Sequence, residues 1–285
     1  MIQAFILSLQ TGMGINLKFN GFANYARILK DPTFKQTLSN TFFYLIIQVP
    51  IMLVLAILLA QLLNNKDLKF KGFFRTCVFL PCATSLVSYS LIFRSMFATD
   101  GLINSILIKL GILSTGYNFL GNSASAKIVI ILALIWRWTG YNMVFYLAGL
   151  QNIEYSVYEA AKIDGAGEYR TFFQITLPLL KPSMAAVGFM MATVYWNDWQ
   201  NALLYITSDR KKPLQLLLIN IQKSIEFLLN NSNVPASVKA AMGGTIPQYS
   251  ATMATVIVVI GPIMVIYPFF QKYFVKGLTV GSVKG

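Results

Sequence analysis

The sequence predicts an all-α fold, a polytopic bundle of helices that cross a membrane. Of the 285 residues, 56% are hydrophobic and 12% are charged, and the mean hydropathy is +0.60. Soluble domains carry roughly 25% charged residues. The apolar residues are also gathered into several runs of about 20 residues or more, the length that a helix needs to cross a bilayer. We therefore expect about five full spans, preceded by a short remnant of a sixth.

The N-terminal region, residues 1–40, is predicted to form a partial first span and an extracytoplasmic lead-in. Met1–Gln10 is apolar but too short to cross a bilayer, and it lacks the charged and long apolar regions of a signal peptide. Phe19–Asn40 is polar and contains Gly21 and Pro32. The remainder, residues 41–285, is predicted to be the transmembrane domain.

Apolar runs in this second part predict five spans, Thr41–Leu63, Phe73–Phe97, Lys127–Leu150, Met184–Ile206 and Tyr249–Phe270. Pro50 lies inside the first span and is expected to kink it. A long polar connection separates the last two spans. The tail Gln271–Gly285 is expected to return to the cytoplasm.

Basic residues give a first indication of orientation. The loop after the first span carries Lys66, Lys69, Lys71 and Arg75. The positive-inside rule places such a loop in the cytoplasm. Over all loops, however, lysine and arginine are shared nearly evenly between the two faces, so charge supports this orientation only weakly.

The composition also excludes several classes of chemistry. The chain has no histidine, which excludes Ser-His-Asp triads and histidine metal sites. The pattern G-x-x-x-x-G-K-[ST] occurs nowhere, so no Walker motif for ATP is expected. Cys77 and Cys82 lie in one apolar run and are interpreted as packing residues. The formal charge of +13 would suggest nucleic acid for a soluble chain, but anionic lipid head groups are the simpler partner here.

A polar interval, Tyr155–Pro178, separates the third and fourth predicted spans. Ser156 followed by Glu159 is a capping-box pattern that predicts a helix start. Alanines at 160 and 161 favour helix, and Gly165 and Gly167 suit a helix C-terminus or a tight turn. We therefore expect a short helix outside the bilayer at this point.

This interval resembles the EAA signature of permease subunits in bacterial binding-protein-dependent ABC importers. The resemblance implies a type I importer permease fold and a cytoplasmic coupling helix that sits in a groove of a separate ATPase subunit. The positions that match this signature or lie within it are Glu159, Ala160, Ala161, Asp164, Gly165, Gly167, Ile175, Leu177 and Pro178. For an isolated Glu-Ala-Ala, a plain helix cap would be the better interpretation. The long spaced pattern between two spans reverses that judgement.

The rest of the chain resembles sugar permeases of the maltose type, but the type changes midway. From Phe19 to about Leu150 the chain is similar to the first permease subunit, for example at Trp136-x-x-x-Gly140-Tyr141-Asn142. Beyond the coupling interval, Trp196-Asn197-x-Trp199, Asp209-Arg210-Lys211 and the C-terminal run from Phe274 are similar to the second subunit. A natural mosaic and a splice are both open explanations.

Polar residues inside the predicted spans are candidates for a substrate pathway, because a charge at mid-membrane needs water, protein or a partner. Sugars are bound by aromatic faces together with hydrogen-bonding groups. The candidates are Trp136, Arg137, Tyr141, Asn142, Trp196, Asn197 and Asp198. For the cluster Tyr195–Asn201, an aromatic belt at head-group depth is an equally good interpretation.

These observations predict a permease subunit of an ATP-driven sugar importer, without enzymatic activity of its own. The resemblance implies a heterodimer with a second permease, an ATPase dimer that binds ATP and Mg²⁺, and an extracytoplasmic solute-binding protein. It also implies the bacterial cytoplasmic membrane. No cofactor or metal is expected in this chain. The alternative is a secondary transporter or channel for a small polar solute, which would have no need of the EAA interval.

Overall fold

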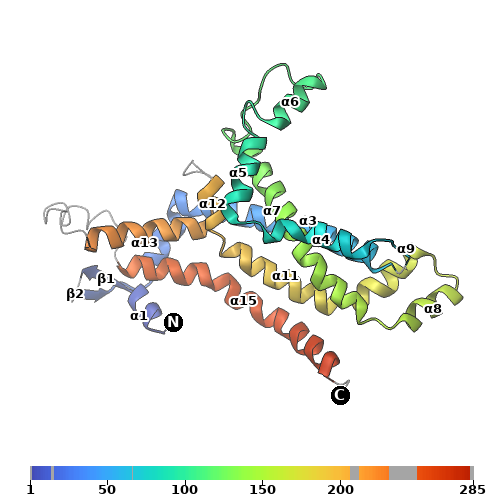
Figure 1. Ribbon diagram of the computed structural model, residues 1–285. Helices are drawn as coiled ribbons and strands as arrows, with labels where there is room; N and C mark the ends of the chain where they lie inside the picture. Colours follow the sequence, from blue (N-terminus) through green and yellow to red (C-terminus); the bar gives the residue numbers. More distant parts are fainter. Residues whose placement is uncertain (1, 14–15, 66, 206–211, 231–248, 283–285) are drawn as a thin grey trace. The chain divides into compact units, whose positions relative to one another are not determined.

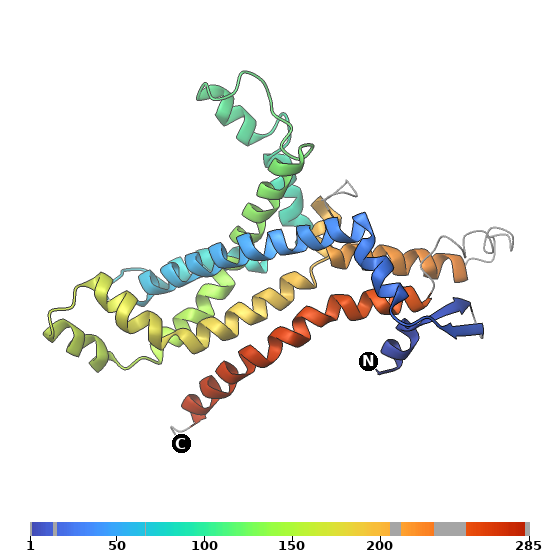
Figure 2. The same ribbon diagram turned by 180° about the vertical axis from the view of Figure 1, so that it is seen from behind.

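The computed structural model describes residues 2–13, 16–65, 67–205, 212–230 and 249–282. The chain divides into two compact units. Figures 1 and 2 show their helices and strands. Unit 1 comprises Met1–Phe43 and Trp196–Tyr267, and unit 2 comprises Tyr44–Tyr195 and Pro268–Gly285. The long helices α3 and α15 contribute residues to both.

Unit 1 begins with a small folded module. Helix α1 (Ile2–Ser8) leads into an antiparallel pair of strands, β1 (Gln10–Met13) and β2 (Asn16–Phe19), followed by helix α2 (Ala23–Lys30). The buried Asn24 amide donates to the carbonyl oxygens of Ser8 and Gln10, both at 2.8 Å. These bonds join α2 to the strands. The N-terminal region is therefore folded, and its hairpin departs from the predicted all-α fold.

Helix α3 (Pro32–Asn64) starts earlier than the predicted Thr41. The carboxylate of Asp31 accepts from the backbone N–H of Thr33 at 2.7 Å and of Phe34 at 3.1 Å, which is an N-cap. Pro32 stands at the first helical position, where its missing N–H costs nothing. Because α3 begins at this cap, residue 40, the predicted boundary of the transmembrane domain, lies inside the helix.

The remaining helices of unit 1 are α12 (Gln200–Tyr205), α13 (Leu214–Asn230) and the larger part of α15 (Tyr249–Ser282). Helix α13 lies within the connection that was predicted to be polar. Its first residue is held by a bond from the Leu214 N–H to the hydroxyl of Thr41, at 2.9 Å. Helices α13 and α15 lie side by side in both views (Figures 1 and 2).

Unit 2 is a helical bundle. It contains the rest of α3 together with α4 (Lys71–Ala83), α5 (Leu86–Met96), α6 (Leu102–Lys109), α7 (Ser123–Gln151), α8 (Tyr155–Ile163), α9 (Glu168–Arg170), the π-helix η1 (Thr171–Thr176), α10 (Leu177–Leu179) and α11 (Lys181–Trp196). Its fully buried side chains include Met52, Tyr89, Met143 and Tyr146. Gly140 of α7 lies against the backbone of Val78 in α4, and no larger residue fits there. Small residues of this kind let membrane helices approach closely.

Three helices are long and apolar enough to cross a membrane, Pro32–Asn64, Ala124–Gln151 and Ser250–Gln271. Two further pairs pass the same test together but are bent, Lys71–Ala83 with Leu86–Met96 by 95° and Glu168–Leu179 with Lys181–Trp196 by 67°. The described part of the chain thus has three to five candidate spans. It is a multi-pass membrane protein, and the predicted count of five depends on treating each bent pair as one span.

Two predicted spans are not single helices. The helix expected over Phe73–Phe97 breaks at Thr84 and Ser85, where the Ser85 hydroxyl caps α5 by accepting from the Ser88 N–H at 3.1 Å. The one expected over Met184–Ile206 ends at Trp196, and a second helix starts at Gln200. At the other end of the chain, α15 continues through Ser282, so much of the predicted tail is helical.

Candidate functional site

The polar interval contains the short helix α8, as predicted, but the predicted cap is wrong. The helix begins at Tyr155 with Glu154 at the N-cap position, and the Glu154 side chain makes no capping hydrogen bond. Ser156 is the second residue of the helix instead of its cap. Glu159 lies in the middle of the helix, so the two side chains cannot form the reciprocal bonds of a capping box.

The end of α8 is a Schellman motif built on Gly165. This glycine has a φ of +74°, and the backbone N–H of Ala166 donates to the carbonyl oxygen of Ala161 at 2.9 Å. The Gly165 N–H donates to the carbonyl of Lys162 at 3.1 Å. These two bonds satisfy carbonyls that the helix end would otherwise leave unpaired. Gly165 is needed for its left-handed backbone, whereas Gly167 has a φ of −67° that other residues adopt.

The predicted coupling positions on α8 and its turn divide by exposure. Glu159, Ala160, Asp164, Gly165 and Gly167 are exposed. Ala161 is only 4% exposed, so it packs within this chain and is not available to a partner.

Two large apolar side chains beside these positions were missed by the sequence analysis. Ile163 is 86% exposed and Tyr169 is 84% exposed. The signal that could have revealed them is that both are large apolar residues within an otherwise polar interval. Ile163 and Tyr169 are therefore candidates for a contact with another protein.

The other predicted coupling residues lie on a second helical segment. Ile175 belongs to η1, and Leu177 and Pro178 belong to α10, which continues toward α11 through the bend. The Leu177 N–H donates to the carbonyl of Phe172, five residues earlier, as a π-helix requires. The interval is therefore two helical pieces joined by the turn at Gly165, instead of one helix followed by a loop.

The pathway candidates on α7 make contacts within unit 2. The Arg137 guanidinium carbon lies 4.5 Å from the centre of the Tyr89 ring and 5.4 Å from that of Trp138, a cation–π arrangement. Tyr141 packs edge-on against Trp138 and Phe145, with ring centres at 5.6 Å and 5.0 Å.

The other two α7 candidates also make contacts within unit 2. Asn142 is fully buried, and its amide donates to the Trp138 carbonyl at 2.9 Å and contacts the sulfur of Met52 at 3.4 Å. Trp136 is exposed and stacks obliquely on Phe93. Each of the four candidates thus has contacts within unit 2, and their role in a substrate pathway stays a prediction.

The second group of candidates lies at the end of α11, within unit 1. Trp196 is 5% exposed, and its indole N–H donates to the carbonyl oxygen of Val259 at 3.0 Å. Because this ring is buried, an aromatic belt facing lipid does not explain it. The Asp198 carboxylate accepts from the backbone N–H of Asn201 at 3.1 Å and from its side-chain amide at 2.6 Å. Asp198 thus caps α12.

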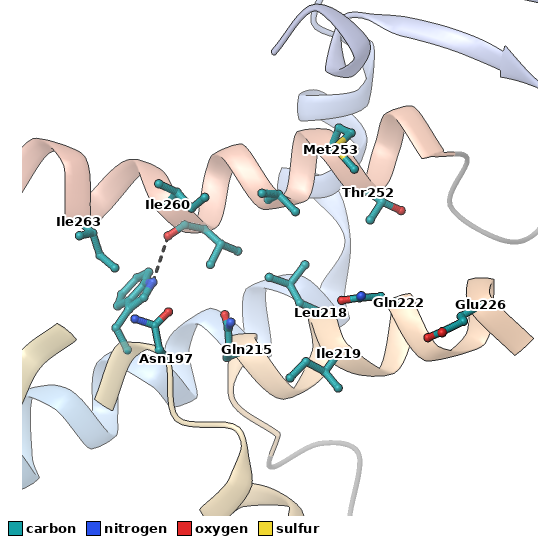
Figure 3. A pocket seen from close by; sticks show the side chains of 13 residues that line it. Asn197, Gln215, Leu218, Ile219, Gln222, Glu226, Thr252, Met253, Ile260 and Ile263 are labelled. Carbon is teal, nitrogen blue, oxygen red and sulfur yellow. Dashed lines mark hydrogen bonds between the residues drawn. The ribbon is translucent and has the colours of Figure 1, made fainter. Parts of the chain in front are cut away.

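A pocket of about 610 Å³ lies between α13 and α15, and Trp196 and Asn197 line one end of it (Figure 3). Helix α13 contributes Gln215, Gln222 and Glu226, and α15 contributes Thr252. The sequence analysis missed these polar residues. Gln215, Gln222 and Glu226 follow one another at spacings of seven and four residues, which places them on one face of α13. This spacing was the signal that could have revealed them. Part of the resemblance to the second permease subunit rests on Asp209-Arg210-Lys211, which lie outside the described residues.

Comparisons with known proteins agree with this architecture. The lactose transport system permease protein LacF of Rhizobium radiobacter is 50% identical over 182 residues, which cover 64% of this chain and 61% of LacF. The arabinooligosaccharides transport system permease protein AraP of Bacillus subtilis (strain 168) is 39% identical over 214 residues, covering 70% of this chain and 66% of AraP. The matches thus span less than two thirds of these relatives.

A chain from the crystal structure of a bacterial ABC transporter involved in the import of the acidic polysaccharide alginate has the same fold. The TM-score is 0.72 at 20% identity, covering 97% of this chain and 88% of the other. The sequence profile of the family described as "Binding-protein-dependent transport system inner membrane component" matches residues 26–280. This match covers nearly all of the described helices, and the chain belongs to that family.

Proposed function

We propose that this chain is a permease subunit of an ATP-driven, binding-protein-dependent importer for a mono- or oligosaccharide. The observation that carries the proposal is α8, an exposed helix closed on Gly165 between two apolar helices of a chain that belongs to the family. This helix buries Ala161 within its own chain and presents Ile163 to the outside. A protein partner outside the membrane would cover it.

The partner would be a cytoplasmic ATPase dimer, which binds ATP and Mg²⁺. Ala160 and Gly165 are exposed and small, so they would let the surface of an ATPase approach the backbone of α8 closely. Ile163 and Tyr169 would supply the apolar contact. Ala161 would act from inside, by anchoring α8 to its own chain.

The segment Glu168–Leu179 would carry the movement of α8 onward. It is helical and meets α11 at a bend of 67°. Ile175, Leu177 and Pro178 on this segment would therefore transmit a push instead of contacting the ATPase directly. Glu159 would provide charge on the exposed face.

The further assembly follows the family. We propose that the chain forms a heterodimer with a second permease, that it receives solute from an extracytoplasmic solute-binding protein, and that it lies in a bacterial cytoplasmic membrane. This chain would contribute five spans if each bent pair crosses the membrane once. The names of LacF and AraP support a saccharide as the solute. The proposed boundary between lead-in and membrane domain stays near residue 40, and the change of permease type midway stays a prediction.

Uptake in proteoliposomes tests the proposal. The chain, a second permease and an ATPase are reconstituted together, and the accumulation of labelled lactose delivered by a binding protein is followed with and without ATP. We expect uptake only with ATP, and loss of uptake in Ala160→Trp, which adds a large side chain to the exposed face of α8. Uptake that continues without ATP would indicate a secondary transporter or a channel.

A matched variant controls for folding. Ser156→Trp also adds a large side chain at an exposed position of α8, but at its first turn and away from Gly165. We expect this variant to insert normally and to retain more uptake than Ala160→Trp. Equal loss in both variants would mean that α8 tolerates no bulk anywhere, and would remove the evidence for a specific contact at Ala160.

A further inference from the structure

The turn between α3 and α4 exposes aromatic rings next to basic side chains. Phe70 is 79% exposed and Phe73 is 66% exposed, and Lys69 is also exposed. Phe74 packs edge-on against Phe73, with ring centres 5.9 Å apart. We call residues Lys69–Arg75 the aromatic–basic turn. Large apolar groups beside cations are typical of segments that lie on a membrane surface.

The neighbouring helices place this turn at the surface of a membrane. Helix α3 is long and apolar enough to cross a membrane, and α4 passes the same test together with α5. Residues 65–70 join α3 to α4, so the turn stays close to the ends of both helices. Figures 1 and 2 both show it at the end of unit 2 where α9 lies. Lipid head groups are therefore within reach of the turn.

Phe70 adopts a backbone conformation that is unfavourable for a large side chain. Its φ is +58° and its ψ is 32°, and it stands at the N-cap position of α4 without a side-chain capping bond. This left-handed conformation is disfavoured for an L-residue by a factor of about 5–30. Because the ring is exposed, packing within the chain does little to offset this cost. Burial of the ring in lipid would offset it.

Contacts within the chain hold the turn in one arrangement. Arg75 Nη2 donates to the carbonyl oxygen of Leu63, in the last turn of α3, at 3.3 Å. A cation at this position also interacts favourably with the negative end of the helix. The Phe74 N–H donates to the Phe70 carbonyl oxygen at 3.2 Å, which closes the first turn of α4. The aromatic rings are therefore presented by a fixed turn.

The sign of the charge distinguishes this turn from α8. Residues 67–75 carry one acidic residue, Asp67, and three basic residues, Lys69, Lys71 and Arg75. Residues 154–168, which contain α8, carry four acidic residues and one basic residue. An anionic membrane surface attracts the first segment and repels the second. Phe70 and Ile163 are similarly exposed, but their surroundings favour lipid for Phe70 and protein for Ile163.

We propose that the aromatic–basic turn docks on anionic phospholipid. Phe70 and Phe73 lie below the head groups, and the ammonium groups of Lys69 and Lys71 pair with the lipid phosphates. The inference goes beyond the proposed function and requires neither ATP nor a solute. Its consequence is that one end of unit 2 carries two different surfaces, the aromatic–basic turn for lipid and α8 for a protein.

Nitroxide spin labels test the docking. Cys77→Ser and Cys82→Ser remove the two native thiols, and Phe70→Cys then provides one site for the label. Ile163→Cys is the matched control, because Ile163 is 86% exposed at the same end of unit 2 but lies among acidic residues. The full chain is reconstituted into nanodiscs of phosphatidylcholine, with or without phosphatidylglycerol. Paramagnetic resonance measures how often each label collides with oxygen, which concentrates in lipid, and with a water-soluble nickel chelate.

The expected result is that the label enters the lipid at position 70 and not at position 163. With phosphatidylglycerol, the label at position 70 collides more often with oxygen than with nickel, whereas the label at position 163 stays accessible to nickel. Lys69→Gln lowers the ratio of docked to undocked label about fivefold, since each lysine near an anionic surface contributes about that factor. Phosphatidylcholine alone lowers the ratio at least as much. Lys162→Gln, an exposed site on α8, leaves it unchanged.

Three results would overturn the proposal. They are equal access of nickel to positions 70 and 163, equal docking with and without phosphatidylglycerol, and, in the assembled complex, a label at position 70 that neither oxygen nor nickel reaches. The last result would assign the turn to a protein interface. If Phe70→Cys does not reach the membrane, Phe73→Cys reports on the same surface. The measurements on the chain alone need no ATPase or solute, so they decide the docking independently of the proposed importer.

Discussion

Replacement of Gly165 by alanine isolates the role of one backbone angle. Gly165 has a φ of +74°, and an added Cβ would meet no atom within 4 Å. The cost is therefore purely conformational, about 1–2 kcal/mol for an L-residue in the left-handed region. That energy corresponds to a factor of about 5–30 in the equilibrium between the closed and frayed end of α8.

Gly167→Ala is the matched control. Gly167 is also exposed, and its Cβ would also meet nothing within 4 Å, but its φ is −67°. Gly165→Asn should fall between the two, because asparagine tolerates the left-handed region better than alanine. The three variants differ in backbone strain much more than in steric contact.

Hydrogen exchange and uptake measure the effect. The amides of residues 165 and 166 close the Schellman motif, at 3.1 Å and 2.9 Å. We expect them to exchange about 5–30 times faster in Gly165→Ala, with ATP-dependent uptake reduced in the same variant and unchanged in Gly167→Ala. Unchanged exchange in Gly165→Ala, or an equal loss of uptake in Gly167→Ala, would refute the reasoning.

Two further substitutions test the packing of each unit. Gly140→Ala should block the approach of α7 to α4, since its Cβ would overlap the Val78 carbonyl oxygen. The variant should therefore lower the yield of folded protein in detergent. Gly72→Ala should leave the yield unchanged, because its Cβ would meet no atom within 4 Å. Asp198→Ala should remove the cap of α12 and destabilise the protein by about 1 kcal/mol in thermal unfolding, while Asp198→Asn retains an accepting oxygen and most of the stability.

The approximate positions of the long apolar helices could be predicted from the sequence, because an apolar run of sufficient length has few alternatives in a membrane. The bends could not. Thr84 and Ser85 interrupt a run that is still apolar enough to cross a membrane. Their effect appears only through the bond from the Ser88 N–H to Ser85. Hydropathy reports which residues avoid water, and it does not report the direction in which the chain continues.

Helix α13 was missed for a related reason. Its glutamines and charged residues lower the hydropathy of the connection, while Leu214 and Leu216 are almost fully buried within unit 1. The partner that buries them is remote in sequence, as the bond from Leu214 to Thr41 shows. The pocket depends on the same long-range packing.

The interval Tyr155–Pro178 contains one feature that could be predicted from the sequence and one that could not. Its glycine turn was recognisable from residue type alone, because only glycine adopts a φ of +74° at no steric cost. The division between Ala160, which is exposed, and Ala161, which is buried, was not recognisable, since two adjacent alanines differ only in the side of the helix that they occupy.

Photocrosslinking tests the contact between α8 and an ATPase subunit most directly. A photoreactive amino acid replaces Ile163, which is 86% exposed on α8, and in a second variant it replaces Ile112, an exposed residue of the segment between α6 and α7. Irradiation of the assembled complex should join the ATPase to the chain at position 163 and not at position 112. Absence of an ATPase adduct at position 163, in a complex that hydrolyses ATP, would contradict the proposed coupling.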